Sequence, residues 1–357
     1  MAKTKIEFVC RECGSSHHQW AGQCLDCKEW NTLEEVVISQ ATSSKPESLK
    51  DLPASKVQNL SEIKSQNNHR LSTGLSELDR TLGGGLVDGS VVLIGGDPGI
   101  GKSTLILQAI AAINASNTTL YVSGEESAEQ VSDRAIRLGI KEDILFIGET
   151  HLEKIIKISK DTRPKVIVID SIQTMVTDLS NSAPGSVTQV RDCAAQLTQY
   201  AKQTNTILLM IGHVTKGGAL AGPRILEHMV DAVLYFEGDA GGRYRIIRAV
   251  KNRFGAVNEI SVFAMGEKGL QQVSNPSSIF LSNQENPSSG SMVMVTREAT
   301  RPLLVEIQAL VDQANGTPKR VSVGLDQNRL SLQLAILHKH SGIATFDQDV
   351  FINVVGG

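Results

Sequence analysis

A glycine-rich segment constrains the fold of this 357-residue chain more than any other feature. Gly96–Ser103 reads GDPGIGKS, which matches G-x-x-x-x-G-K-[ST] at every position. The apolar run Ser90–Gly95 before it suits a buried strand, and Thr104–Ala112 after it suits a helix. In a strand–loop–helix unit of this kind, backbone N–H groups and the helix N-terminus surround phosphate oxygens. The segment therefore predicts a site for ATP and Mg²⁺.

The side chains of this loop have separate expected roles. Lys102 is expected to reach the β- and γ-phosphates, and Ser103 to hold Mg²⁺ through its hydroxyl. The residues expected to bind the nucleotide are Gly96, Asp97, Pro98, Gly99, Ile100, Gly101, Lys102, Ser103 and Thr104.

Apolar runs and helical patterns alternate through the middle of the chain. The expected strands are Val91–Gly95, Thr119–Ser123, Asp143–Ile147, Val166–Asp170, Thr206–Ile211 and Ala232–Phe236. The helices between them include Ala128–Leu138 and Val187–Gln203. This alternation predicts an α/β fold with a mostly parallel sheet flanked by helices. Because ligands bind at the carboxyl ends of such strands, polar residues that follow them are candidates for catalysis.

Acidic residues follow two of the expected strands. Asp170 ends the run Val166–Asp170, which suits a Walker B strand, so its carboxylate is expected to reach Mg²⁺. Glu125 and Glu126 follow Thr119–Ser123, where a carboxylate could orient and polarise the attacking water. Position after the strand favours Glu125 as that base. The alternative is that both acids serve the N-terminus of the next helix.

Polar and basic residues follow the expected strand Thr206–Ile211. His213 is a candidate sensor of the γ-phosphate, with a purely structural histidine as the alternative. The next segment, KGGALAGPR, is rich in glycine and carries Lys216 and Arg224 at its ends. Such a loop could grip the phosphate backbone of a nucleic acid, or it could be an ordinary surface loop.

A second basic segment, KNRFG at 251–255, follows the expected strand Arg243–Val250. Lys251 and Arg253 lie two residues apart on an extended segment, so their side chains point to the same side. In a ring of subunits such a pair could reach the γ-phosphate held by a neighbour, as an arginine finger does. From the residues alone, a solvated charge cluster is an equal alternative.

The N-terminal segment carries four of the five cysteines, as two C-x-x-C pairs: Cys10, Cys13, Cys24 and Cys27. Two such pairs supply four thiolates for a tetrahedral, structural Zn²⁺. Trp20, Trp30 and Phe8 are expected to shield the sulfurs. His17 and His18 are expected to be surface residues, with a role as rival ligands the alternative.

Composition narrows the cellular context. Cysteines paired in this way favour a reducing cytoplasm over export, and no secretory signal or membrane-spanning run is visible, so a membrane partner is not expected. The formal net charge is −3, so any affinity for nucleic acid must come from local basic groups. Cys193, at an apolar position of an expected helix, is expected to be a core residue.

Several of these segments together resemble the bacterial RadA (Sms) family of DNA repair proteins: CRECG with CLDCKEWNT, GGDPGIGKST, YVSGEES and KNRFG. The resemblance runs from about residue 6 to the end of the chain. It implies a RecA-like ATPase that assembles as a hexameric ring. It further implies binding of single-stranded DNA and ATP-driven branch migration of recombination intermediates, in partnership with RecA. It places the Walker lysine at Lys102, the Mg²⁺ aspartate at Asp170, the zinc ligands at the four paired cysteines and the signature motif at 251–255.

The resemblance completes the expected organisation of the chain. We expect a C4 zinc ribbon at 1–34, a flexible linker at 35–68, a RecA-like ATPase domain at 69–274 and a partial, α+β Lon-protease-like domain at 275–357. Members of the family normally continue past this point, so a truncated chain is expected. The family is not proteolytic, and no residue here supports proteolysis. The alternative function is a regulatory RecA-like ATPase that switches a protein partner without DNA.

Overall fold

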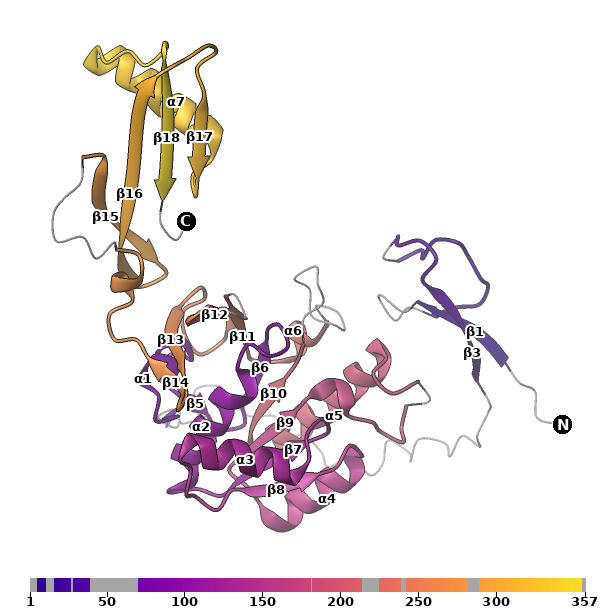
Figure 1. The fold of residues 1–357 in the computed structure, drawn as a ribbon. Helices are drawn as coiled ribbons and strands as arrows, with labels where there is room; N and C mark the ends of the chain where they lie inside the picture. The colour runs from indigo at the N-terminus through magenta and orange to yellow at the C-terminus, as the bar shows by residue number, and fades with distance from the viewer. Residues whose placement is uncertain are drawn as a thin grey trace, which may run out of the picture. The chain divides into compact units, whose positions relative to one another are not determined.

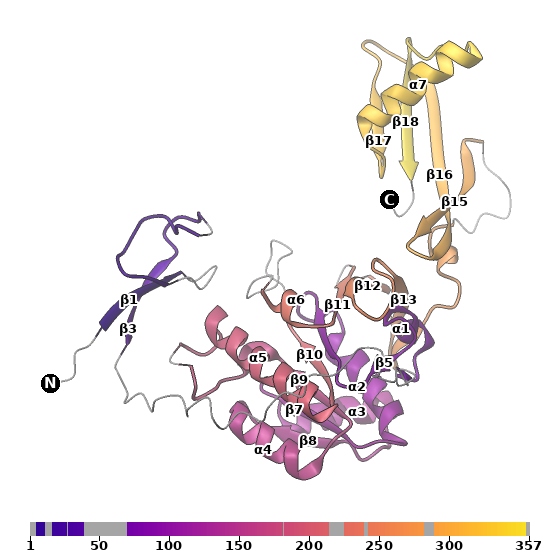
Figure 2. The same cartoon turned by 180° about the vertical axis from the view of Figure 1, so that it is seen from behind.

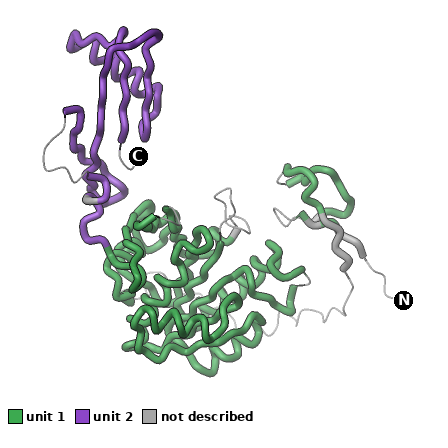
Figure 3. The backbone as a smooth tube through the Cα atoms, viewed as in Figure 1, with its two compact units in different colours: residues 1–272 green, residues 273–357 purple. Residues whose placement is uncertain are grey.

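The computed structural model describes residues 5–10, 16–26, 28–38, 70–180, 182–213, 225–238, 242–281 and 289–354. Figures 1 and 2 show its helices and strands from two sides. The chain forms two compact units, Met1–Gln272 and Val273–Gly357 (Figure 3).

A nine-stranded sheet forms the centre of the first unit, in the order β14-β13-β12-β11-β6-β10-β9-β7-β8. The six parallel strands are β6 (Val91–Gly95), β7 (Thr119–Ser123), β8 (Leu145–Gly148), β9 (Val166–Asp170), β10 (Ile207–Ile211) and β11 (Ala232–Glu237). Three antiparallel strands extend it beyond β11: β12 (Tyr244–Asn252), β13 (Ile260–Gly266) and β14 (Gly269–Gln272).

Helices cover both faces of this sheet (Figure 1). One core cluster joins the sheet to α1 (Ser76–Thr81), α2 (Lys102–Asn114) and α3 (Ala128–Leu138). A second cluster joins the opposite face to α4 (Leu152–Thr162), α5 (Val187–Thr204) and α6 (Ile225–Met229). Alternate side chains of the buried strands enter the two clusters, as the period of a β-strand requires. The predicted α/β class, with a mostly parallel sheet between helices, is confirmed.

Local signals explain the element boundaries. Ser127 caps α3 in a capping box with Gln130, and Gly139 ends the helix in the left-handed conformation with φ 72°. These signals account for the agreement between the expected and observed helix. The strand expected at Asp143–Ile147 instead begins at Leu145, because the Ile144 N–H donates to the Glu142 carbonyl in a turn.

The N-terminal strands β1 (Lys5–Cys10), β2 (Ser16–His17) and β3 (Leu33–Ile38) form an antiparallel sheet in the order β2-β1-β3. β3 thus continues past residue 34, the end of the expected zinc ribbon. Phe8 packs against the buried Cys10 and Cys24 as expected. The expectation for the two tryptophans is wrong: Trp20 and Trp30 are 60% and 68% exposed. Both rings flank Gly22 instead.

The second unit contains a four-stranded sheet in the order β15-β16-β18-β17. Its strands are β15 (Ser291–Glu298), β16 (Arg301–Gln313), β17 (Arg320–Val323) and β18 (Gln348–Val354), and its helix is α7 (Gln327–Ser341).

Two short strands of the first unit, β4 (Arg70–Leu71) and β5 (Leu86–Val87), pair with each other. Among the described residues, no helix combines the length and apolar character needed to cross a bilayer.

Candidate active site

The glycine-rich loop connects the buried strand β6 to helix α2. Gly96, Gly99 and Gly101 have φ angles of 148°, 76° and 111°, which favour glycine. A Cβ at Gly96 would also lie 2.8 Å from Phe236 Cβ. No side chain caps the N-terminus of α2, so the first N–H groups of the helix are available to an anion. The loop is therefore shaped to bind phosphate.

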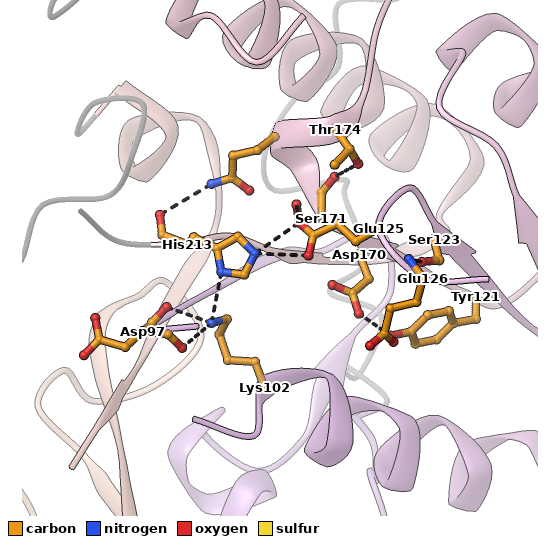
Figure 4. Close-up of polar contacts among 12 residues, drawn as sticks. Asp97, Lys102, Tyr121, Ser123, Glu125, Glu126, Asp170, Ser171, Thr174 and His213 are labelled. Carbon is orange, nitrogen blue, oxygen red and sulfur yellow. Dashed lines mark hydrogen bonds and ion pairs between the residues drawn. The ribbon is translucent and has the colours of Figure 1, made fainter. Parts of the chain in front are cut away.

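Lys102 lies inside this loop and is only 4% exposed. Its ammonium donates hydrogen bonds to the carbonyls of Gly96, at 2.7 Å, and Asp97, at 2.8 Å (Figure 4). Burial lowers the pKa of Lys102, and the nearby carboxylates, Asp170 first, oppose that shift. The two loop carbonyls thus accept the hydrogen bonds of the ammonium. Phosphate oxygens would take the place of these acceptors when nucleotide binds.

Asp170 ends β9, next to Ser123 at the end of β7. Its carboxylate is 3% exposed and accepts a hydrogen bond from the Tyr121 hydroxyl. Burial raises the pKa of Asp170, whereas hydrogen bonds from Tyr121 and Ser103 lower it. Ser103 and Asp170 therefore offer two neighbouring oxygen atoms as metal ligands, the ligand type that Mg²⁺ prefers.

Glu125 and Glu126 have different partners although they are neighbours. Glu126 forms a bidentate ion pair with Arg134, with N–O distances of 2.5 and 2.6 Å. Glu125 accepts a hydrogen bond from the Ser171 hydroxyl and lies 3.1 Å from His213 Nε2. Its hydrogen bond with His213 is the main favourable cause of its lowered pKa, which burial opposes. Only Glu125 of the two faces Lys102 and His213 (Figure 4).

His213 bridges the lysine and the glutamate. Its Nδ1 lies 3.4 Å from Lys102 Nζ, and its Nε2 lies 3.1 Å from Glu125 Oε1. Because an ammonium can only donate, Nδ1 is the acceptor, and the proton of the neutral ring is on Nε2 and points at Glu125. The sequence indicated each of these three residues separately, but it did not indicate this chain of contacts.

Sequence reasoning missed three residues that support the site: Tyr121, Ser171 and Arg134. Ser171 directly follows Asp170, and Thr174 donates to its carbonyl at 2.8 Å. A Cβ at Gly124 would lie 2.1 Å from Thr174 Oγ1, so this glycine lets the two strand ends approach. The strand ends were visible in the sequence, but the partners of β7 and β9 were not.

Lys251 and Arg253 lie at the opposite edge of the sheet from the loop of their own chain. β12 runs antiparallel to β11, and Asn252 at its end pairs with Ala232 at the start of β11. Lys251 Nζ donates to the Glu227 carbonyl at 2.6 Å. Arg253 Nη1 lies 3.1 Å from the buried Asp231 carboxylate. Within one chain, the structure does not bring this pair to Lys102.

The N-terminal sheet brings two candidate zinc ligands into one cluster. Cys10 and Cys24 are both buried, whereas Cys13 and Cys27 lie outside the described residues. His17 was expected at the surface, but it lies against Cys24, with 3.5 Å between Nε2 and Sγ. The ligand atoms of His17, Cys24 and Asp26 lie within 4.8 Å of one another. A buried cysteine sulfur in a small metal-ligand cluster, with a second buried cysteine, Cys10, in the same core, fits a zinc ribbon.

Three further expectations concern single residues. Lys216 and Arg224 lie outside the described residues. Cys193 of α5 is fully buried in the protein core, and burial raises the pKa of its thiol to about 12. Such a thiol is inert, which agrees with a core residue rather than a redox group.

Comparison with known proteins agrees with both sites. The AAA domain model matches residues 58–219, and the rubredoxin metal binding domain model matches residues 8–35. DNA repair protein RadA of Pseudomonas aeruginosa is 56% identical over 359 residues, which cover 100% of this chain and 79% of that protein. DNA repair protein RadA of Escherichia coli is 53% identical over 365 residues, again with 100% and 79% covered.

A more distant relative gives the same result. DNA repair protein RadA of Bacillus subtilis is 47% identical over 362 residues, with the same coverage. The fold, the phosphate-binding loop and these relatives together describe a RecA-like ATPase with an N-terminal zinc ribbon. The chain belongs to the RadA family of DNA repair proteins.

Proposed function

We propose that this protein couples ATP hydrolysis to movement along single-stranded DNA during DNA repair and homologous recombination. The observation that carries the proposal is the contact chain Lys102–His213–Glu125 at the carboxyl edge of the sheet. It connects the phosphate-binding loop and the candidate base to the last described residue before segment 214–224. ATP binding and DNA binding would meet at this point.

Residues 96–104 hold ATP in this proposal. Ser103 and Asp170 hold Mg²⁺, which neutralises charge on the phosphates when it is bound. Lys102 exchanges its contacts with Gly96 and Asp97 for phosphate oxygens. The lowered pKa of Glu125 keeps its carboxylate ionised, so it is ready to accept a hydrogen bond from the attacking water.

DNA contacts are assigned to the segment that follows His213. Lys216 and Arg224 at its ends supply positive charge for a phosphate backbone. His213 would report the state of the γ-phosphate to this segment, because Lys102 and Glu125 both touch its ring.

A ring of identical subunits, as a hexamer, would complete the site. Lys251 and Arg253 lie at the sheet edge opposite their own phosphate-binding loop, so they are assigned to the γ-phosphate of a neighbour, as in an arginine-finger site. Branch migration of recombination intermediates together with RecA is the reaction that we propose for this ring.

The remaining parts of the chain keep the roles predicted from the sequence. We propose a C4 zinc ribbon that extends past the predicted end at 34 to Ile38, the end of β3, a linker from there to 68, an ATPase domain at 69–274 and a non-proteolytic, Lon-like domain at 275–357. Cys10, Cys13, Cys24 and Cys27 hold the zinc. The cytoplasm is the proposed location.

Binding of single-stranded DNA tests the coupling. Fluorescence anisotropy of a labelled oligonucleotide should show tighter binding with a non-hydrolysable ATP analogue than with ADP. Replacement of Lys216 and Arg224 by alanine should weaken binding, and the dependence on salt should become less steep. A regulatory ATPase that switches a protein partner would instead show no DNA binding in either nucleotide state.

Subunit mixing tests the shared site. Lys102→Ala and Arg253→Ala should each be inactive alone. A mixture should recover part of the activity, because some interfaces then combine an intact loop with an intact Arg253. If the mixture shows no activity although subunit exchange has been verified, action of Arg253 on the neighbouring subunit is ruled out.

A further inference from the structure

Tyr121 is a fully buried phenol directed at the candidate Mg²⁺ ligand Asp170. In the parallel pairing of β7 and β9, Tyr121 lies opposite Val168. Asp170 is two residues further along β9, so it is on the same face of the sheet as Tyr121. The phenol therefore extends along that face, and its hydroxyl donates to Oδ2 of Asp170 (Figure 4).

The phenol ring is held in place by its surroundings. It stacks on Phe146 of the neighbouring strand β8, with 6.3 Å between ring centroids and an interplanar angle of 17°. Leu107 of α2 and Val131 of α3 belong to the same core cluster. These side chains also line a neighbouring cavity, so the stack on Phe146 and the hydrogen bond to Asp170 are the contacts that orient the fully buried phenol.

The carboxylate depends on this donor. Asp170 is almost fully buried, and the charges of Glu125 and Glu126 lie near it. A buried carboxylate needs hydrogen-bond donors, and the terminal torsion of an aspartate is intrinsically broad. The Tyr121 hydroxyl donates to it, and Ser103 also contributes to its electrostatic environment. Ser103 is itself a candidate metal ligand, whereas Tyr121 is held in the core and acts on Asp170 only as a hydrogen-bond donor.

We infer that Tyr121 is a positioning residue: its hydroxyl fixes the rotation of the Asp170 carboxylate, so that the carboxylate is oriented for the Mg²⁺ that accompanies ATP. This inference rests on the proposed assignment of Mg²⁺ to Asp170. Tyr121 does not touch nucleotide or metal in this account. Its effect is on metal affinity and passes through Asp170.

The test uses Tyr121→Phe, which removes the hydroxyl and keeps the ring. Tyr200→Phe is the matched control, because Tyr200 is also a buried tyrosine and lies in α5, remote from the site. Electron paramagnetic resonance should measure Mn²⁺ binding to the full chain with a non-hydrolysable ATP analogue. We expect Mn²⁺ affinity to fall about tenfold or more in Tyr121→Phe, as is typical when a partner of a metal ligand is lost. Tyr200→Phe should bind Mn²⁺ like the wild type.

Nucleotide binding without metal shows whether Tyr121→Phe weakens only the metal site or disturbs the whole nucleotide site. Affinity for the analogue in the presence of a chelator should be equal in wild type and Tyr121→Phe. In hydrolysis assays the half-saturating Mg²⁺ concentration should rise, whereas the rate at saturating Mg²⁺ should recover. Unchanged Mn²⁺ affinity in Tyr121→Phe would overturn the inference. A wild type that binds Mn²⁺ and the analogue without hydrolysing ATP would instead refute the proposed function.

A double-mutant cycle gives a second test that needs no metal. Thermal unfolding should be compared for Tyr121→Phe, Asp170→Asn and the double variant. Because the two groups are in contact, the drop in midpoint of the double variant should differ from the sum of the single drops. Additive drops would mean that the hydroxyl does not act through Asp170.

Discussion

The two neighbouring glutamates offer a sharp test, because the same substitution should have opposite consequences at adjacent positions. Glu125 faces His213 and the loop lysine, whereas Glu126 is paired with Arg134. We predict that Glu125→Gln abolishes most hydrolysis and leaves stability nearly unchanged. We predict that Glu126→Gln lowers stability and leaves most hydrolysis intact.

The magnitudes follow from the two environments. Loss of a general base typically lowers the rate by about 10²–10⁴-fold, so Glu125→Gln should lower kcat by at least about a hundredfold. The side chains of Arg134 and Glu126 are 17% and 28% exposed. A partly exposed bidentate pair of this kind contributes about 1 kcal/mol. For a domain of this size, that corresponds to a fall in Tm of about 2–4 °C.

The assay measures steady-state ATP hydrolysis and thermal unfolding of both variants in the same buffer. Binding of a fluorescent ATP analogue shows whether the site still forms. A loss of hydrolysis in Glu126→Gln equal to that in Glu125→Gln would refute the assignment of the base. Full hydrolysis in Glu125→Gln would refute it as well.

The remaining predictions concern stability. Gly255→Ala should lower the free energy of unfolding by about 1–3 kcal/mol, because its Cβ would lie 2.7 Å from the Cα of Gly83. Gly266→Ala, whose Cβ would meet its nearest atom at 3.8 Å, should change it by less than about 0.5 kcal/mol in denaturant titrations; equal losses would contradict the steric argument. The backbone N–H of His151 and the ammonium of Lys154 lower the pKa of Glu149 to about 2. A depressed carboxyl pKa stabilises the fold above the pKa of the unfolded chain, so the advantage of wild type over Glu149→Gln should be full at pH 6 and shrink as the pH falls toward 2. A thermal difference that stays constant with pH would contradict this. Removal of zinc by a chelator should unfold residues 8–35 and leave the unfolding of the ATPase core in place, as limited proteolysis would reveal; an N-terminal segment that stays resistant would argue against structural zinc.

The sequence predicted the strands of the ATPase core well where local signals were strong. β6 and β9 are continuous apolar, mostly β-branched runs that end at a glycine and an acid, and their observed bounds match the expected ones. α3 matches because a capping box begins it and a left-handed glycine ends it. Such signals act over a few residues and need no tertiary information.

Lateral contacts could not be predicted in the same way. β7 lies beside β9 although β8 comes between them in the chain, so the bond between Tyr121 and Asp170 depends on strand order. The contacts of His213 depend on that order too. Trp20 and Trp30 were predicted to be buried because they are aromatic. They are exposed, because the small N-terminal sheet does not cover them.

ATP hydrolysis with and without single-stranded DNA tests the central claim most directly. The wild-type chain and Lys102→Ala should be compared at saturating Mg²⁺. We predict that single-stranded DNA raises the rate of the wild type severalfold, and that Lys102→Ala shows no turnover in either condition. A wild-type rate that does not respond to DNA, or turnover that survives in Lys102→Ala, would contradict the account.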